Sequence, residues 1–232
     1  MIADKEDECG TRMGFTMKFE WIYTWNVIPE LLKGMKMTMF IAVLGILLGF
    51  MIGLITGLIR SGKHRILQHV TGIYVTVIRG TPLMVQALYL YFAIPMMLQF
   101  NLSALTAGIL AIGLNSGAYI SEIVRGAIQS VDPGQREAGE CLGLNPFQIT
   151  TAVILPQAFK IMLPGLCNQF IISVKDTSLL TVIGVAEMTH QASRAVSSTF
   201  RTVEVYTALA ILYFLLNTLL SFLLAKWERR MK

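Results

Sequence analysis

Long apolar runs alternate with short polar segments along almost the whole chain of 232 residues. Apolar runs with few charges are typical of helices that cross a bilayer, whose hydrocarbon core is spanned by about 20 residues. The pattern therefore predicts an all-α membrane protein with about five transmembrane helices. The predicted spans are residues 31–59, 66–99, 104–124, 156–174 and 205–225.

Two of the predicted spans contain polar interruptions. The second span is broken at "IRGTP", where Arg79 is followed by Gly80 and Pro82, two residue types that weaken or kink a helix. After the fourth span, the stretch "KDTSLLTVIGVAEMT" continues at membrane depth although it contains charged side chains. We therefore expect one broken helix and one span that carries charge into the membrane.

The first predicted span contains four glycines, Gly45, Gly49, Gly53 and Gly57, at a constant spacing of four residues. This spacing places them on one face of a helix, where a second helix can approach closely. The alternative is that glycine is simply frequent in membrane helices.

Composition and charge support the membrane interpretation. Hydrophobic residues make up 54% of the chain and charged residues only 14%, and the mean hydropathy is +0.62. The net charge of +5 does not indicate nucleic-acid binding, because the basic residues flank apolar runs and do not form a stripe with aromatic residues. Since Lys and Arg accumulate in cytoplasmic loops, "RSGKHR" and the terminal "KWERRMK" predict an outside N-terminus and a cytoplasmic C-terminus.

The chain is expected to form one membrane domain with short ends. Residues 1–30 are predicted to be an extracytoplasmic tail and interfacial segment, because they lack a signal-peptide pattern and end in the aromatic residues Trp21, Tyr23 and Trp25. Residues 31–226 form the transmembrane domain, with a cytoplasmic loop at about 126–155. Residues 227–232 form a cytoplasmic tail.

Motifs for enzymatic chemistry are weak in this sequence. "GLIRSGKH" has the glycine and lysine spacing of a phosphate loop, but His64 stands where Ser or Thr would hold magnesium. The three cysteines lie far apart and have no metal-ligand spacing. We therefore expect a chain that is not an enzyme, binds no metal and has no nucleotide site of its own.

The segment "QREAGECLGLNPFQITTAVILPQ" carries a specific pattern of small, apolar and acidic residues. It resembles the signature loop of permease subunits of binding-protein-dependent ABC importers, with Gly139 for Ala and Val153 for Ile as its departures. A short helix between two turns could seat in a groove of a partner, and a plain solvated loop is the alternative. The matching residues are Glu137, Ala138, Gly139, Gly143, Val153, Leu155 and Pro156.

The resemblance extends on both sides of this loop. "VIRGTPLMVQ", "LNSGAYISEIVRGAIQSV" and "CNQFIISVKDTSLLTVIGVAEMT" are similar to the polar amino acid uptake branch of these permeases, and the Asn-Gln form is similar to its glutamine-importing members. The resemblance implies a type I importer permease of the bacterial inner membrane that carries glutamine, or else glutamate, cystine, histidine or arginine. It also implies two cytoplasmic ATP-binding subunits that use ATP and Mg, and an extracytoplasmic solute-binding protein. Five spans are few for a solute pathway, so we expect a second permease copy.

Polar residues within the spans are candidates for contact with the substrate, because ionisable groups in a bilayer usually face a cavity or a partner. An amino acid needs an acceptor for its ammonium group and donors for its carboxylate. The helical period predicts two polar faces, one in the third span and one in the fourth. The candidates are Arg79, Asn115, Tyr119, Glu122, Asn168, Gln169, Ser173, Lys175 and Asp176.

Two alternatives stay open for these residues. The charged ones can form structural ion pairs, Arg79 with Glu122 or Lys175 with Asp176, and the amides can form hydrogen bonds between helices. Two other function classes also stay open, an ATP-independent channel or secondary transporter and a membrane scaffold. The loop around Glu137 argues against the channel or secondary transporter, and the polar faces within the spans argue against the scaffold.

Overall fold

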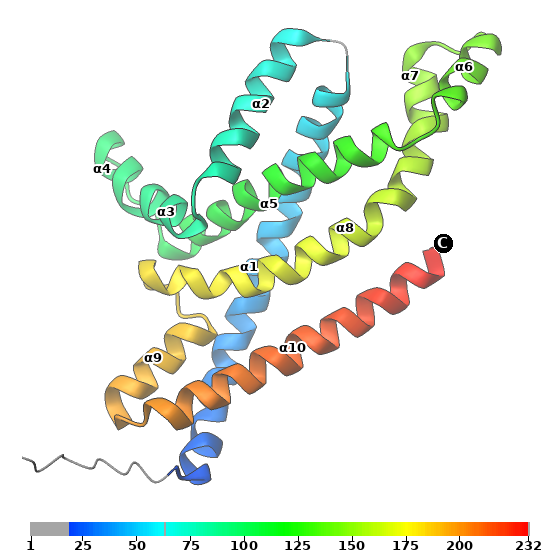
Figure 1. Ribbon diagram of the computed structural model, residues 1–232. Coiled ribbons are helices and arrows are strands. Elements are labelled where there is room, and N and C mark those ends of the chain that lie inside the picture. Colours follow the sequence, from blue (N-terminus) through cyan, green and yellow to red (C-terminus); the bar gives the residue numbers. More distant parts are fainter. Residues whose placement is uncertain (1–18, 63, 232) are drawn as a thin grey trace, which may run out of the picture.

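The computed structural model describes residues 19–62 and 64–231, and every regular element among them is helical (Figure 1). The long helices are α1 (Trp21–Ser61), α2 (Arg65–Gly80), α5 (Ala104–Gln129), α8 (Leu155–Asp176) and α10 (Thr202–Met231). The shorter elements are α3 (Leu83–Leu88), η1 (Tyr89–Ala93), α4 (Ile94–Leu98), α6 (Pro133–Cys141), α7 (Pro146–Gln148), η2 (Ile149–Ile154), η3 (Thr177–Ile183) and α9 (Met188–Thr199).

The helices confirm the predicted membrane architecture. Among the described residues, four helical stretches are long and apolar enough to cross a membrane, and the bent pair 65–80 and 83–98 makes a fifth when it is counted as one span. This pair is bent by 107°, which confirms the predicted break at "IRGTP". The stretch Pro146–Ile183 is continuous, so the fourth span extends beyond residue 174 as expected.

The first helix is longer than the predicted span. It begins at Trp21 and not at residue 31, so residues 21–30 of the predicted interfacial segment form its first turns. Residues 1–18 of the predicted tail lie outside the described part of the chain.

Proline explains the two wide, π-helical turns of the chain. The ring of a proline clashes with the carbonyl group four residues earlier and removes one helical hydrogen bond. Pro95 follows η1 and Pro156 follows η2, and in both cases the residue four positions earlier lies inside the wide turn. Widening the turn relieves the clash while the helix continues.

The glycine face of α1 packs directly against α5. A Cβ atom added at Gly53 would lie 2.6 Å from the Cβ atom of Ile120, and one added at Gly57 would lie 2.7 Å from the Cβ atom of Val124. Real Cβ atoms do not approach other atoms that closely, so the contact requires glycine. The four-residue spacing therefore reflects helix packing, as one of the two sequence interpretations predicted.

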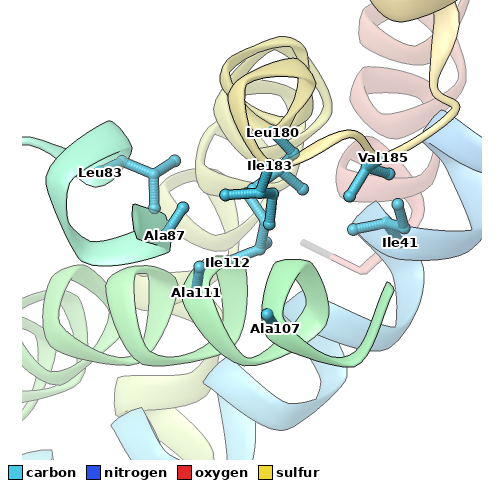
Figure 2. Packing of buried hydrophobic residues seen from close by; sticks show 9 residues of the cluster. All are labelled: Ile41, Leu83, Ala87, Ala107, Ala111, Ile112, Leu180, Ile183 and Val185. Atoms are coloured by element: carbon cyan, nitrogen blue, oxygen red, sulfur yellow. The ribbon is translucent and has the colours of Figure 1, made fainter. Parts of the chain in front are cut away.

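The other elements surround this helix pair. Figure 2 shows side chains from α1, α3, α5 and η3 pointing toward one another in one apolar cluster, with Leu180 and Ile183 of η3 directed toward Ile112 of α5. A second apolar cluster joins α1, α9 and α10. In Figure 1, α6 and α7 lie at the far end of α5 and α8, away from α3, α4 and α9.

A methyl group at Gly49 tests the contact between α1 and α5. It would lie 2.8 Å from the Cβ atom of Ser116 and 2.9 Å from the backbone oxygen of Gly113, so the helices would have to separate. We expect Gly49→Ala to lower the free energy of unfolding by about 1–3 kcal/mol. The midpoint of thermal unfolding of the purified protein in detergent measures this loss.

Gly72→Ala is the matched control, because an added methyl group at Gly72 meets no atom within 4 Å. Alanine favours a helix over glycine by up to about 1 kcal/mol, so this variant should unfold at the same temperature as the wild type or higher. If Gly49→Ala unfolded no earlier than Gly72→Ala, the close packing of α1 against α5 would be wrong.

Candidate functional site

A polar face of α5 lies against the end of α2. Asn115, Tyr119 and Glu122 lie on this face of α5 and Arg79 lies in the last turn of α2. The guanidinium carbon of Arg79 is 5.2 Å from the centre of the Tyr119 ring, and Nη1 of Arg79 is 3.5 Å from Oε1 of Glu122. The fold thus brings together three of the predicted site residues, and it forms the Arg79–Glu122 ion pair that the sequence left open.

Two further arginines bind the Glu122 carboxylate. Nη1 of Arg60, near the end of α1, donates a hydrogen bond of 2.7 Å to Oε1. Nη2 and Nε of Arg125 donate to Oε2 at 2.7 Å and 3.0 Å. Both carboxylate oxygens therefore accept charge-assisted hydrogen bonds, which are stronger than neutral ones. One carboxylate joins α1, α2 and α5.

Gln86 holds the bend between α2 and α3. Its Nε2 atom donates hydrogen bonds to the backbone oxygens of Ile78 at 2.7 Å and Thr81 at 3.0 Å. These carbonyl groups lie at the end of α2, where helical partners are missing. Nδ2 of Asn115 donates to Oε1 of Gln86 at 3.2 Å, so the bend is joined to the polar face of α5.

The polar face of α8 packs against a different side of α5. Gln169 is 4% exposed and Ser173 is 1% exposed. The Oγ atoms of Ser173 and Ser116 are 2.9 Å apart, and Ser173 also donates to the backbone oxygen of Gln169. For Ser173 this is a hydrogen bond between helices.

The remaining predicted residues of α8 are more accessible. Asn168 and Lys175 are exposed, and Asp176 is half-buried at the end of the helix. Within residues 19–62 and 64–231, no ion pair joins Lys175 to Asp176. The structure therefore places the candidates in two groups, one around Arg79 and Glu122 and one along α8.

The loop after α5 forms the predicted short helix between two turns. Oδ1 of Asp132 accepts a hydrogen bond from the N–H group of Gly134 at 2.7 Å and caps α6. Gly143 has a φ angle of 75°, a left-handed conformation that favours glycine. Asn145 and Gln148 then form a capping box that starts α7, with both hydrogen bonds at 2.9 Å.

The loop folds back onto the start of α8. Gly139 is buried, and a Cβ atom added there would lie 2.9 Å from Cγ1 of Ile149. Nε2 of Gln157 donates a hydrogen bond of 3.1 Å to Oε1 of Gln135. These contacts hold α6 in a defined position relative to the membrane helices.

The outer surface of the loop is apolar as well as charged. Glu137 and Ala138 are exposed, Leu142 is 78% exposed and Phe147 is 75% exposed. Exposed apolar side chains on a loop between the spans are candidates for contact with a partner protein. Of the other signature residues, Val153 and Leu155 are partly buried and Pro156 is exposed.

Four residues of the site escaped the sequence analysis. Gln86 belongs to the quoted segment "VIRGTPLMVQ", and Ser116 and Arg125 belong to "LNSGAYISEIVRGAIQSV". The family resemblance therefore covers these stretches, but it did not identify these three positions as site residues. Arg60 lies in the basic segment that served only to predict topology. In the described part of the chain, no group of three or more His, Cys, Asp or Glu residues is placed to hold a metal ion.

Comparisons with known proteins show the family of the chain. Residues 45–232 match the family model "Binding-protein-dependent transport system inner membrane component". The chain is 47% identical over 217 residues to the glutamine transport system permease protein GlnP of Escherichia coli (strain K12), which covers 93% of this chain and 99% of that protein. It is 32% identical over 216 residues to the arginine transport system permease protein ArtQ of Bacillus subtilis (strain 168), with 93% and 99% covered.

A solved structure has the same fold. The crystal structure of an amino acid ABC transporter with histidines matches with a TM-score of 0.86 and 38% sequence identity, covering 92% of this chain and 100% of that chain. The resemblance that the loop indicated is thereby confirmed. The chain belongs to the family of inner membrane components of binding-protein-dependent transport systems.

Proposed function

We propose that this chain is the permease subunit of an ATP-driven importer for a polar amino acid, with glutamine as the first candidate. The observation that carries the proposal is the 47% identity, along 93% of the chain, to a glutamine transport system permease protein. An arginine permease and a transporter crystallised with histidines are also similar to the chain. Arginine and histidine are therefore alternative substrates, and glutamate and cystine are the others that the family resemblance implies.

The importer needs partners that this chain does not supply. ATP hydrolysis takes place in two cytoplasmic ATP-binding subunits, which bind ATP and Mg. An extracytoplasmic solute-binding protein delivers the amino acid, and a second permease copy completes the pathway through two-fold symmetry. The complex lies in the bacterial inner membrane, surrounded by lipid, with the N-terminus outside and the C-terminus in the cytoplasm.

Members of the two polar groups of the permease line the path of the amino acid, while Glu122 and Ser173 also hold the helices that carry these groups together. Arg79, Asn115, Tyr119 and Glu122 line one part of the pathway, along α5. The residues on α8 line another part, and they offer amides, a hydroxyl group, an ammonium group and a carboxylate. These residues are Asn168, Gln169, Ser173, Lys175 and Asp176.

The loop from α6 to α7 transmits ATP hydrolysis to the membrane helices. Leu142 and Phe147 seat in a groove of the ATP-binding subunit, while Glu137 contacts its rim. A short helix with exposed apolar side chains suits this type of docking. Movement of the loop then switches the permease between outward-facing and inward-facing states.

Leu142→Asp tests this docking, because it places a charge where an apolar side chain is expected to be buried by the ATP-binding subunit. We expect at least a tenfold loss of co-purifying ATP-binding subunit, since burying an unpaired carboxylate is strongly unfavourable. Membrane insertion should be unchanged, because Leu142 is 78% exposed and lies in the loop between the third and fourth spans.

Phe100→Asp is the matched control, an equivalent change at an exposed apolar residue between α4 and α5. On the proposed topology this residue is extracytoplasmic, so the amount of co-purifying subunit should stay at the wild-type level. Equal amounts with Leu142→Asp and with the wild type would show that the α6–α7 loop does not dock through this surface.

The substrate is tested by the rate of ATP hydrolysis in vesicles that contain the complete complex. A panel of glutamine, glutamate, cystine, histidine and arginine is added at increasing concentration. We expect glutamine to stimulate hydrolysis at the lowest concentration. Uptake that proceeds without ATP would contradict the proposed function and favour a channel or secondary transporter, and a lower half-maximal concentration for another amino acid would replace glutamine as the substrate.

A further inference from the structure

The charges around Glu122 do not balance. Three guanidinium groups, those of Arg60, Arg79 and Arg125, surround a single carboxylate. Two of them bind the carboxylate at 2.7 Å, one on each oxygen. Three positive charges therefore face one negative charge in this cluster.

Of the three arginines, Arg79 makes the longest contact with the Glu122 carboxylate. Its closest approach to Glu122 is 3.5 Å, which is beyond the usual length of a hydrogen bond between nitrogen and oxygen. Its other partner among the described residues is the ring of Tyr119, which interacts with the face of the guanidinium and not with its N–H groups. The side chain is 44% exposed, whereas that of Arg60 is 17% exposed. The donors of Arg79 are thus available to another acceptor.

The place of Arg79 favours contact with a solute. It lies in the last turn of α2, directly before the 107° bend that Gln86 holds in place. Broken helices in transporters are typically found where the backbone lines a substrate pathway. Asn115 and Tyr119 lie on the same face of α5 as Glu122, so the donors of Arg79 lie beside further polar side chains.

The chemistry of a guanidinium group selects the ligand. It is planar and presents parallel N–H groups, which match the two oxygens of a carboxylate. We infer that Arg79 binds the α-carboxylate of the transported amino acid, while Glu122, bound by Arg60 and Arg125, holds the helices and does not receive the ammonium group. This inference rests on the proposed function. It assigns substrate binding to Arg79 and a structural role to Glu122.

Binding of the substrate at Arg79 changes the contacts at the end of α2. When the solute carboxylate binds, Arg79 exchanges a loose contact with Glu122 for a two-point contact with the solute. Glu122 keeps its hydrogen bonds to Arg60 and Arg125, so the contact between α1 and α5 persists. Only the end of α2 changes partners, which makes the segment next to the bend the element that responds to substrate.

The test compares glutamine with 4-aminobutanamide, which has the same side-chain amide and ammonium group but no carboxylate. Binding is measured by calorimetry on the purified complex of permease and ATP-binding subunits, without the solute-binding protein. In the wild type we expect glutamine to bind at least about thirtyfold more tightly than the analogue, as a charge-assisted contact predicts. In Arg79→Gln the ratio of the two affinities should fall below threefold, because glutamine binding weakens while binding of the analogue does not.

Two further variants complete the test. Arg79→Lys keeps the charge but loses the planar two-point contact, so its ratio of the two affinities should be intermediate. This variant replaces Arg79→Gln in the test if the Arg79→Gln complex fails to assemble. Arg65→Gln is the matched control, because it removes an exposed arginine from the other end of α2 and should keep the wild-type ratio.

The possible outcomes separate the inference from the proposed function. If Arg79→Gln weakened glutamine and the analogue by the same factor, Arg79 would be a structural residue and the inference would be wrong. Equal affinities of the wild-type complex for glutamine and for the analogue would also overturn the inference. A wild-type complex that is stimulated by no amino acid of the panel would contradict the proposed function itself.

Discussion

The contact between the glycine face of α1 and α5 is the constraint on which the rest of the fold depends. Lipid chains are as apolar as leucine, so membrane helices associate through close van der Waals packing and not through the hydrophobic effect. Gly49, Gly53 and Gly57 let α5 approach until its side chains and backbone oxygens touch the backbone of α1. Only a narrow range of relative positions permits this fit, so the register of the two helices is determined by it.

That register also determines where the charges meet. Gly57 packs against Val124 and the backbone oxygen of Ser121, and Arg60 lies one turn further along α1. Arg60 consequently reaches Glu122, which lies on α5 beside the same contact, at 2.7 Å. The ion cluster is thus a consequence of helix packing, and it adds a polar lock where the glycine face ends. Arg79 joins this cluster from α2, the helix that packs less closely.

Much of the architecture could be predicted because it depends on local pattern. Apolar length predicted the spans, Gly80 and Pro82 predicted the break, and the turns around α6 followed from Pro133 and Gly143. For Glu122 the sequence offered Arg79 as one of two alternatives, and the spacing of three residues places Arg125 beside it on the helix, but Arg60 on α1 could not be predicted. Helical periodicity shows which residues share a face, but the choice between α2 and α8 as the neighbour of that face is a tertiary property.

The same limit applies to buried acids and to the polar face of α8. Glu187 is fully buried, which the composition of the chain does not predict. Its burial is tolerated because its carboxylate oxygens accept hydrogen bonds from the N–H groups of Thr189 and His190 and so cap α9. Periodicity placed Gln169 and Ser173 on one face, and the structure adds that Ser173 meets Ser116 between two helices. A polar face in a membrane helix therefore indicates a partner without saying whether that partner is protein or solute.

The position of the α6–α7 loop connects these two polar faces. The chain runs from the end of α5 through α6, α7 and η2 directly into α8, and Gly139 packs beneath Ile149 at the start of the return. A force on the loop therefore acts on both helices that carry the candidate substrate residues. Because Ser116 and Ser173 join these helices and the packed interior resists gradual deformation, the pair should move as one body. The bend at Gly80, with its loosely held Arg79, is then the point at which α2 can respond independently.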